Sequence, residues 1–181
     1  IYCLLFLAPV LSLAQADDEI RSFLQFNGNY DFTAIGGTMN TEENGCFVLT
    51  ESSATFTLEP NQSIVSAHLY WAGSGSINFG SAYPSDQAVT LNGMEVRPTA
   101  EFFGEAFGAS YTTTFMGITT TRDYFSYYAN VSEIVTVDGT YTLSDFDIRG
   151  NIQNSIGNSD YCNNTTDFAG WSIIIIYEDL T

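Results

Sequence analysis

The sequence predicts an all-β protein, an antiparallel two-sheet sandwich of jelly-roll-like type. Short stretches rich in β-branched and aromatic residues recur along the 181 residues, with glycine, proline and asparagine between them. No stretch keeps a helical period over the roughly ten residues that a substantial helix needs. No internal repeat of fixed length is present, so neither a solenoid nor a propeller is expected.

The N-terminal residues predict export. An apolar run from Ile1 to Leu13 is followed by Ala14-Gln15-Ala16 and then by three acidic residues. A hydrophobic stretch before a small-x-small site is typical of a secretory signal peptide. We therefore expect a signal peptide over residues 1–16, N-terminally incomplete because no initiator Met is present, and one β-sandwich domain over residues 17–181. The alternative is an amphipathic or buried N-terminal helix.

The first expected strands are Phe23–Phe26 and Tyr30–Ala34, joined by a hairpin turn at Asn27-Gly28-Asn29. The next expected strands are Cys46–Thr50, Ala54–Leu58 and Ile64–Ala72. Within the last of these, alternation puts one apolar set of side chains on a core face and a half-polar set on the other face. The expected core set is Val65, Ala67, Leu69 and Trp71, and the half-polar set is Ile64, Ser66, His68 and Tyr70.

Turn residues divide the second half of the chain into further elements. Asn92-Gly93 predicts a tight hairpin within Gln87–Val96, because both residues tolerate positive φ. The residues Asn130–Val135 predict one helical turn, with three apolar side chains on one face. The remaining expected strands are Tyr111–Met116, Arg122–Ala129 and Thr140–Ile148.

A run of four isoleucines near the end predicts the central strand of a sheet. Ile173–Ile176 lies between Trp171 and Tyr177, and its stiff β-branched side chains are apolar on both faces. Such a strand should have protein above and below it. The sequence stops at Thr181, so we expect a fragment of a longer protein in which this strand lacks a neighbour and forms an exposed edge.

Charge excludes two classes of partner. The chain has 21 acidic residues against four arginines, which gives a net charge of −17. A field of this sign repels nucleic-acid phosphates and anionic lipid headgroups, so we expect no nucleic-acid binding and no membrane insertion after signal removal. The acidity fits solubility in a salty or divalent-rich medium, so we expect no cofactor, and calcium binding is the alternative. The candidate calcium ligands are Asp145, Asp147 and Asp160, although their spacing is not that of an EF-hand.

The cysteines predict a disulfide. Cys3 lies in the expected signal peptide, which leaves Cys46 and Cys162 in the mature domain. An even pair in an exported chain indicates a disulfide bond. A zinc site is not expected, because His68 is the single histidine of the sequence and no Cys-x-x-Cys is present.

The sequence has no recognisable catalytic signature. No Gly-x-Ser-x-Gly accompanies His68, so we expect a histidine bonded to its neighbours and no enzymatic activity. The acid pairs Asp145-x-Asp147 and Glu178-Asp179 leave glycoside hydrolysis as an alternative. Abundant aromatics suggest a sugar-stacking platform, although core filling is the competing interpretation. The candidate platform residues are Tyr70, Tyr124, Tyr127 and Tyr128.

Four short motifs, taken in their order along the chain, carry a family resemblance. They are Ala67-His68-Leu69-Tyr70-Trp71-Ala72-Gly73, Tyr128-Ala129-Asn130-Val131, Gly139-Thr140-Tyr141-Thr142 and Ala169-Gly170-Trp171-Ser172 with the isoleucine run. Together they resemble an uncharacterised N-terminal β-domain of large secreted bacterial surface proteins, which often precedes immunoglobulin-like repeats. Where that family is expected to have an acid, this chain has Asn130.

The resemblance implies a secreted or cell-surface location. The expected function is a non-enzymatic structural or adhesion module of a bacterial surface or matrix protein, with other surface proteins or polysaccharide as partners. A carbohydrate-binding module accessory to a secreted hydrolase is the alternative from another class, and the hydrolase itself comes third.

Overall fold

The computed structural model describes residues 22–40, 48–77, 88–99, 110–115, 118–149 and 168–180. Within these ranges the chain forms nine strands: β1 (Tyr30–Thr38), β2 (Ser52–Phe56), β3 (Gln62–Ile77), β4 (Val89–Leu91), β5 (Met94–Val96), β6 (Ser110–Phe115), β7 (Ile118–Asn130), β8 (Gly139–Ser144) and β9 (Ala169–Asp179). A search of the same ranges for a helix with the length and hydropathy to cross a bilayer finds none.

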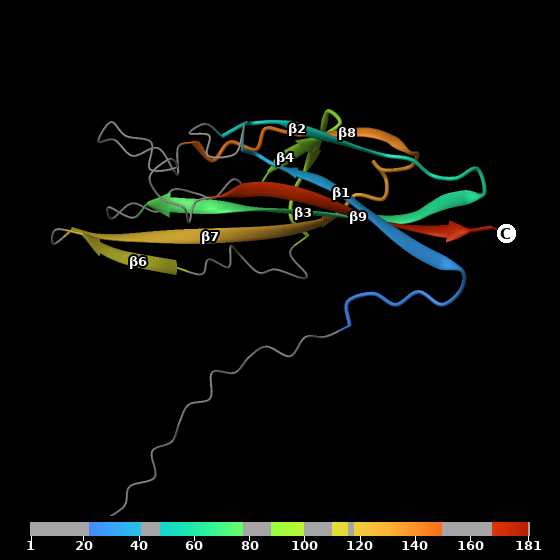
Figure 1. Cartoon of the computed structure of the whole chain (residues 1–181), viewed down its shortest axis with the longest axis horizontal. Coiled ribbons are helices and arrows are strands. Elements are labelled where there is room, and N and C mark those ends of the chain that lie inside the picture. Colours follow the sequence, from blue (N-terminus) through green and yellow to red (C-terminus); the bar gives the residue numbers. More distant parts are fainter. Residues whose placement is uncertain are drawn as a thin grey trace, which may run out of the picture.

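The strands form two antiparallel sheets packed face to face (Figure 1). One sheet has the order β1-β9-β3-β7-β6 and the other has the order β2-β8-β4-β5. Successive parts of the chain pass repeatedly from one sheet to the other, and neither sheet closes into a barrel. The predicted all-β, antiparallel sandwich is confirmed.

The core lies between the sheets and is rich in aromatics. Trp71 of β3 and Tyr127 of β7 are both almost fully buried, with ring centroids 5.5 Å apart. The indole nitrogen of Trp171 on β9 donates a 2.6 Å hydrogen bond to Ser52 Oγ on β2, which ties one sheet to the other. Tyr141 on β8 donates its hydroxyl proton to the carbonyl of Val137, four residues upstream, as a tyrosine corner does in many sandwiches.

The isoleucine strand is central, as predicted. β9 pairs with β1 on one side and with β3 on the other along almost its whole length. Ile173 and Ile175 are fully buried in the core, whereas Ile174 and Ile176 are half-buried on the opposite face. The expectation of an exposed edge at this strand is wrong, because β1 occupies that edge. The outermost strands of the sheet are β1 and β6.

A register irregularity in β3 corrects the expected core face. Ile64 pairs with Tyr177 and Ser66 pairs with Ile176, so Val65 is an extra residue on β3. Such a bulge reverses the alternation of side chains on one side of it. Val65 is therefore 40% exposed, while Ile64 packs against the core and Ala67, Leu69 and Trp71 remain buried as predicted.

Two predicted hairpins have different outcomes. At Asn92-Gly93 both residues have positive φ, and Leu91 pairs directly with Met94, so the predicted tight hairpin is confirmed. The predicted hairpin at residues 27–29 is wrong. Residues 22–27 form no strand, and Phe23 contacts the rings of His68 and Tyr128. A phenylalanine that lies across a sheet face buries more apolar surface than one on an added edge strand.

The other predicted elements are found with shifted bounds. β6 and β7 correspond to the expected pair after residue 110, and β2 begins two residues before the expected Ala54. Of the expected strand Cys46–Thr50, the described part forms one isolated bridge, between Val48 and Asn40. The predicted helical turn is a hydrogen-bonded turn in which the amide of Val135 donates to the carbonyl of Val131.

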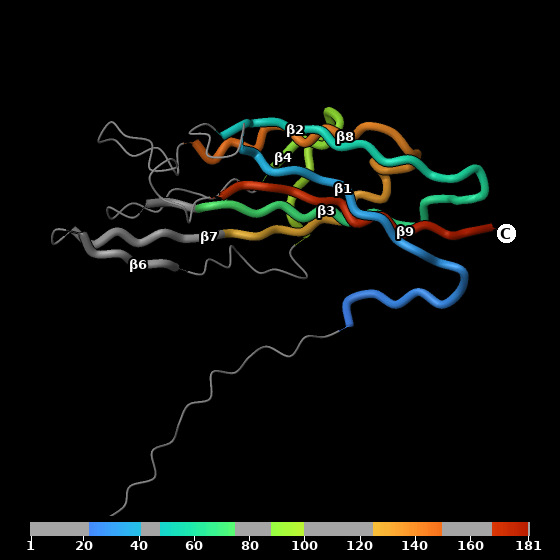
Figure 2. The backbone as a smooth tube through the Cα atoms, viewed as in Figure 1, coloured from blue at the N-terminus to red at the C-terminus, as the bar shows by residue number. Residues whose placement is uncertain are grey.

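The described N-terminal segment lies on one side of the sandwich. Figure 2 shows residues 22–29 turning back into β1 near the C-terminal end of β9. At that end the amide of Asp179 donates to the carbonyl of Asn29, and Tyr30 pairs with Glu178. The segment therefore enters the fold beside the last residues of the central strand.

Candidate functional site

The five-stranded sheet presents one face away from the other sheet, and we call it the outer face. The strand register places side chains on this face in three rows that run across four strands. The rows are Ala34–Ile174–His68–Asn130, Gly36–Ser172–Tyr70–Tyr128 and Thr38–Gly170–Ala72–Ser126. Polar and aromatic residues lie at the β7 side of the first two rows, and small residues fill the middle of the third row.

His68 is held by two hydroxyl groups. Its Nδ1 lies 2.9 Å from the Tyr128 hydroxyl oxygen and its Nε2 lies 3.1 Å from Ser66 Oγ. The rings of His68 and Tyr128 are stacked with an interplanar angle of 16°. Both imidazole nitrogens therefore have a partner, which confirms the prediction of a histidine bonded to its neighbours.

Burial keeps this group of side chains uncharged. His68 is 4% exposed, and desolvation lowers its pKa below the ordinary value of 6.5. Desolvation also raises the pKa of Tyr70, and it raises the pKa of Tyr128 with a further contribution from Tyr70. At neutral pH the imidazole and both phenols therefore stay neutral.

Phe23 covers one end of this network. Its ring meets Tyr128 edge-on at 5.1 Å and His68 edge-on at 6.0 Å, and both arrangements are favourable for aromatic pairs. Tyr128 is consequently only 3% exposed. The aromatic surface that remains open on the outer face begins at Tyr70, whose ring is 5.2 Å from that of Tyr128.

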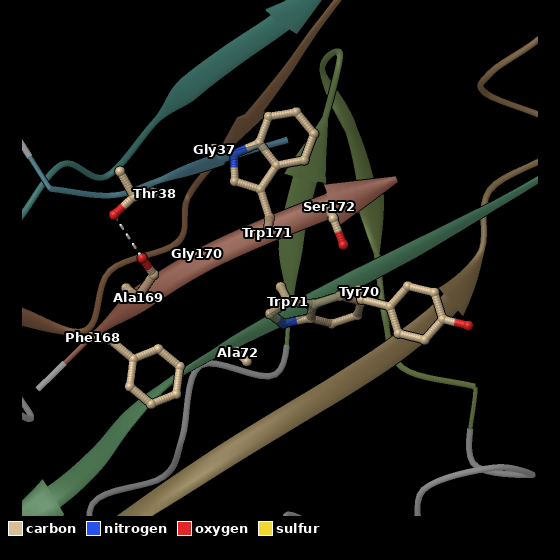
Figure 3. Close-up of a pocket in the computed structure, with 10 residues that line it drawn as sticks. All are labelled: Gly37, Thr38, Tyr70, Trp71, Ala72, Phe168, Ala169, Gly170, Trp171 and Ser172. Carbon is tan, nitrogen blue, oxygen red and sulfur yellow. Dashed lines mark hydrogen bonds between the residues drawn. The ribbon is translucent and has the colours of Figure 1, made fainter. Parts of the chain in front are cut away.

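Beside Tyr70 the outer face contains a depression of about 450 Å³, which we call the outer-face hollow (Figure 3). Ala72, Gly170 and Ser172 lie in the two rows beneath it and contribute little side-chain volume. Figure 3 shows the rings of Tyr70 and Phe168 on either side of Ala72, with the Trp171 indole directed away from both. The remaining lining residues are Gly37, Thr38, Trp71, Ala169 and Trp171.

Phe168 was not among the predicted site residues. It directly precedes β9, its side chain is 44% exposed, and its backbone is fixed because Ser74 donates an amide proton to its carbonyl. A phenylalanine before a strand carries no signal in the sequence that separates it from a core residue. Its place across the hollow from Tyr70 depends on the pairing of β3 with β9.

The four predicted platform tyrosines do not form one surface. Tyr70 lines the outer-face hollow, but Tyr128 is buried beneath Phe23. Tyr127 is wrong as a platform residue, because strand alternation turns it into the core, where it packs on Trp71. Tyr124 pairs with Ser74 through the backbone, and its side chain lies outside the described part of the structure.

The predicted acid pair is also wrong as a shared site. Asp145 follows the last residue of β8 and has a φ of +58°, so the two acids do not lie on one strand face. Asp145 accepts a 2.6 Å hydrogen bond from Thr90 Oγ1. Asp147 forms an ion pair with Arg149, whose hydrogen bonds lower the pKa of this carboxyl. Among the described residues no group of three metal-ligating side chains comes together.

Several predicted features lie outside the described residues. These are the third calcium candidate Asp160, both members of the predicted disulfide, Cys46 and Cys162, and the expected signal peptide over residues 1–16. The calcium set as a whole and the disulfide therefore stay predictions.

Asn130, which stands where the resemblance leads us to expect an acid, holds the turn after β7. Its Oδ1 accepts hydrogen bonds from the Ser132 amide at 3.0 Å and from the Ser132 hydroxyl at 2.7 Å. The same Ser132 hydroxyl oxygen accepts a 3.0 Å bond from the amide of Ala67 on β3. The turn after β7 is thereby fixed to the sheet, beside a second, more polar depression of about 480 Å³ lined in part by Glu95 and Arg97.

Comparison with known proteins gives no relative. No protein-family model matches the chain, and no curated protein matches it significantly. The resemblance to bacterial surface domains therefore stays a prediction.

Proposed function

We propose that the chain is a non-enzymatic extracellular binding module, structural or adhesive in role, from a bacterial surface or matrix protein. The observation that carries the proposal is the contrast on the outer face. The outer-face hollow lies open between Tyr70 and Phe168, whereas the neighbouring His68 has both nitrogens bonded. An open apolar depression beside satisfied polar groups suits binding better than proton transfer.

The acids support the same proposal. A glycosidase needs two carboxyl groups facing each other across a cleft, about 5 to 10 Å apart. Here Asp145 and Asp147 have separate partners, and Asp179 accepts a 2.6 Å hydrogen bond from Asn61. None of these three acids lines either depression on the described surface. The acids that do, Glu95 and Glu133, lie at the second depression, and Glu95 is paired there with Arg97.

The extracellular part of the proposal is supported by the N-terminal sequence. The apolar run from Ile1 to Leu13 before Ala14-Gln15-Ala16 has the order of an export signal, and the mature domain keeps an even pair of cysteines. The family resemblance points to the same compartment. The net charge of −17 favours solubility and disfavours adhesion to anionic lipid.

A carbohydrate-binding module accessory to a secreted hydrolase is the second candidate. It is favoured by the two aromatic rings beside the outer-face hollow, because aromatic side chains present flat apolar surfaces to a ligand. The two candidates differ in what the rest of the protein does. They share the requirement that this face binds something outside the chain.

An adhesion assay tests the proposal. Beads coated with the full chain should adhere to bacterial cells or extracellular matrix, and no soluble sugar should be released from the matrix. Phe168→Ala should reduce adhesion. Met94→Ala, at an equally exposed position on β5 of the other sheet, should not. Adhesion no greater than that of albumin-coated beads would overturn the proposal, as would release of sugars.

A further inference from the structure

We infer that the outer-face hollow is a binding site for a short stretch of a neutral oligosaccharide, with Phe168 at one end and Tyr70 at the other. The inference rests on the proposed binding function and names the ligand class for it. Four features of the described residues carry it: the shape of the hollow, its chemistry, the pairing of its strands and its charge.

The shape fits a small flat ligand. A volume of about 450 Å³ lies within the range of pockets that bind small molecules. Gly170 has no side chain, and Ala72 and Ser172 have short ones, so a ring can approach the sheet closely. Figure 3 shows the two aromatic rings on either side of Ala72.

The chemistry fits a sugar, which has apolar C–H faces and a rim of hydroxyl groups. Phe168 and Tyr70 provide apolar ring surface, and Tyr70 also carries a hydroxyl group. Ser172 adds a second hydroxyl in the middle of the depression. Among the described residues the structure gives the side chains of Ser172 and Tyr70 no hydrogen-bond partner, so both are available to a ligand.

The pairing of the strands argues against a peptide. An extended peptide usually binds a sheet by adding a strand at a free edge. The hollow lies mainly over β9 and β3, and it reaches Gly37 and Thr38 of the edge strand β1 at one side. β9 and β3 each have a neighbour on both sides, so their backbone donors and acceptors are occupied by the ladders and a ligand over them must use side chains.

The charge argues for a neutral sugar. The chain carries −17 overall, which repels uronate or sulfate groups. Arg97 and Arg149, the arginines whose side chains the structure describes, pair with Glu95 and Asp147 and do not line the hollow. No described basic side chain is therefore placed to hold an anionic sugar.

Calorimetric titration of the full chain with cellohexaose, chitohexaose and mannohexaose tests the inference, with hexagalacturonate as the anionic comparison. At least one neutral probe should bind with a dissociation constant below about 1 mM. Phe168→Ala should weaken binding at least about tenfold, because it removes one stacking surface. Ala72→Leu should do the same by filling the hollow while keeping both rings.

Phe32→Ala is the matched control. Phe32 is 64% exposed on β1 and does not line the hollow, so its replacement should leave affinity unchanged. Circular dichroism spectra of all variants should overlay. Absence of binding by the three neutral probes at millimolar concentrations would overturn the inference, as would tighter binding of hexagalacturonate or unchanged affinity in both hollow variants.

The outcomes separate the two proposals. Adhesion to cells or matrix without binding of these sugars would overturn the oligosaccharide site and leave the binding module standing. Cleavage of a hexasaccharide into shorter products would overturn the non-enzymatic function. If cleavage were found, the affinity of Ala72→Leu for the hexasaccharide would still show whether the hollow holds the sugar.

Discussion

At the scale of single residues, the outer face is organised by His68. Its imidazole is buried and bonded on both sides by the hydroxyls of Tyr128 and Ser66. A neutral imidazole can donate one of these bonds and accept the other, whereas an imidazolium can only donate. The arrangement therefore favours the neutral form, in agreement with the lowered pKa.

The lowered pKa of His68 makes stability depend on pH. Below about pH 6.5 the unfolded chain binds a proton that the folded chain resists, so the free energy of unfolding falls as the pH drops through this window. The variant His68→Gln lacks this pH-dependent contribution to the free energy of unfolding, because a glutamine side chain does not bind a proton in this range. At pH 7.5 it should be less stable than the wild type by about 1–3 kcal/mol, because buried hydrogen bonds are lost.

Urea unfolding at pH 7.5 and at pH 5.5 measures this effect. The difference in unfolding free energy between the wild type and His68→Gln should narrow at the lower pH. A difference that stays constant or widens would show that His68 is not kept neutral by the fold. Comparing the two proteins at each pH removes the contribution of the carboxyl groups, which both share.

At the scale of secondary-structure elements, the contact between β1 and β9 is unusually close. A Cβ atom at Gly36 would fall against the carbonyl oxygen of Trp171 and within 2.7 Å of the Cα of Ser172. Both contacts are with backbone, which cannot move without breaking the ladder. The next residue, Gly37, would place its Cβ 3.3 Å from Ser52 Oγ, a side-chain atom that needs to shift only by a few tenths of an ångström and can do so while it keeps the bond from Trp171.

Replacing each glycine by alanine should change stability by different amounts at the two positions. Alanine is generally the better residue in a strand interior, by roughly 0.5–1 kcal/mol. Gly36→Ala should nevertheless destabilise the protein by about 2 kcal/mol or more, because the backbone must shift. Gly37→Ala should change stability by less than half of that amount. Thermal unfolding of both variants measures this, and equal effects would contradict the close approach.

At the scale of the whole molecule, charge is the dominant unbalanced feature. The sequence has 21 acidic side chains, four arginines and no lysine. The described ion pairs, Arg97–Glu95 and Arg149–Asp147, are local and exposed, so they contribute little to stability. Self-repulsion among the remaining carboxylates opposes the compact state and is screened by salt.

The melting temperature should therefore rise with ionic strength. Differential scanning calorimetry in increasing sodium chloride should show a steady increase that levels off near about 0.5 M, where the screening length is a few ångströms. Potassium chloride should act equally, because screening does not depend on the identity of the monovalent cation. A melting temperature that falls, or that responds to one cation alone, would contradict self-repulsion as the cause.

The local patterns of the sequence determined the class of fold and much of its order. Asn92-Gly93 has the backbone freedom that a two-residue hairpin needs, and the isoleucine run is apolar on both sides, as a central strand must be. Each of these signals is contained within a few neighbouring residues. For the same reason His68 could be assigned a structural role from its isolation in the sequence.

Only the tertiary structure decided which side chains share a surface. Segments that are distant in sequence decide three features of this surface. They are the bulge at Val65, the direction of the Tyr127 side chain into the core and the packing of Phe23 over Tyr128. A shift of one residue in register moves every side chain of a strand to the other face. The outer-face hollow needs Phe168 and Tyr70 on the same face, and they share it only because β9 pairs with β3.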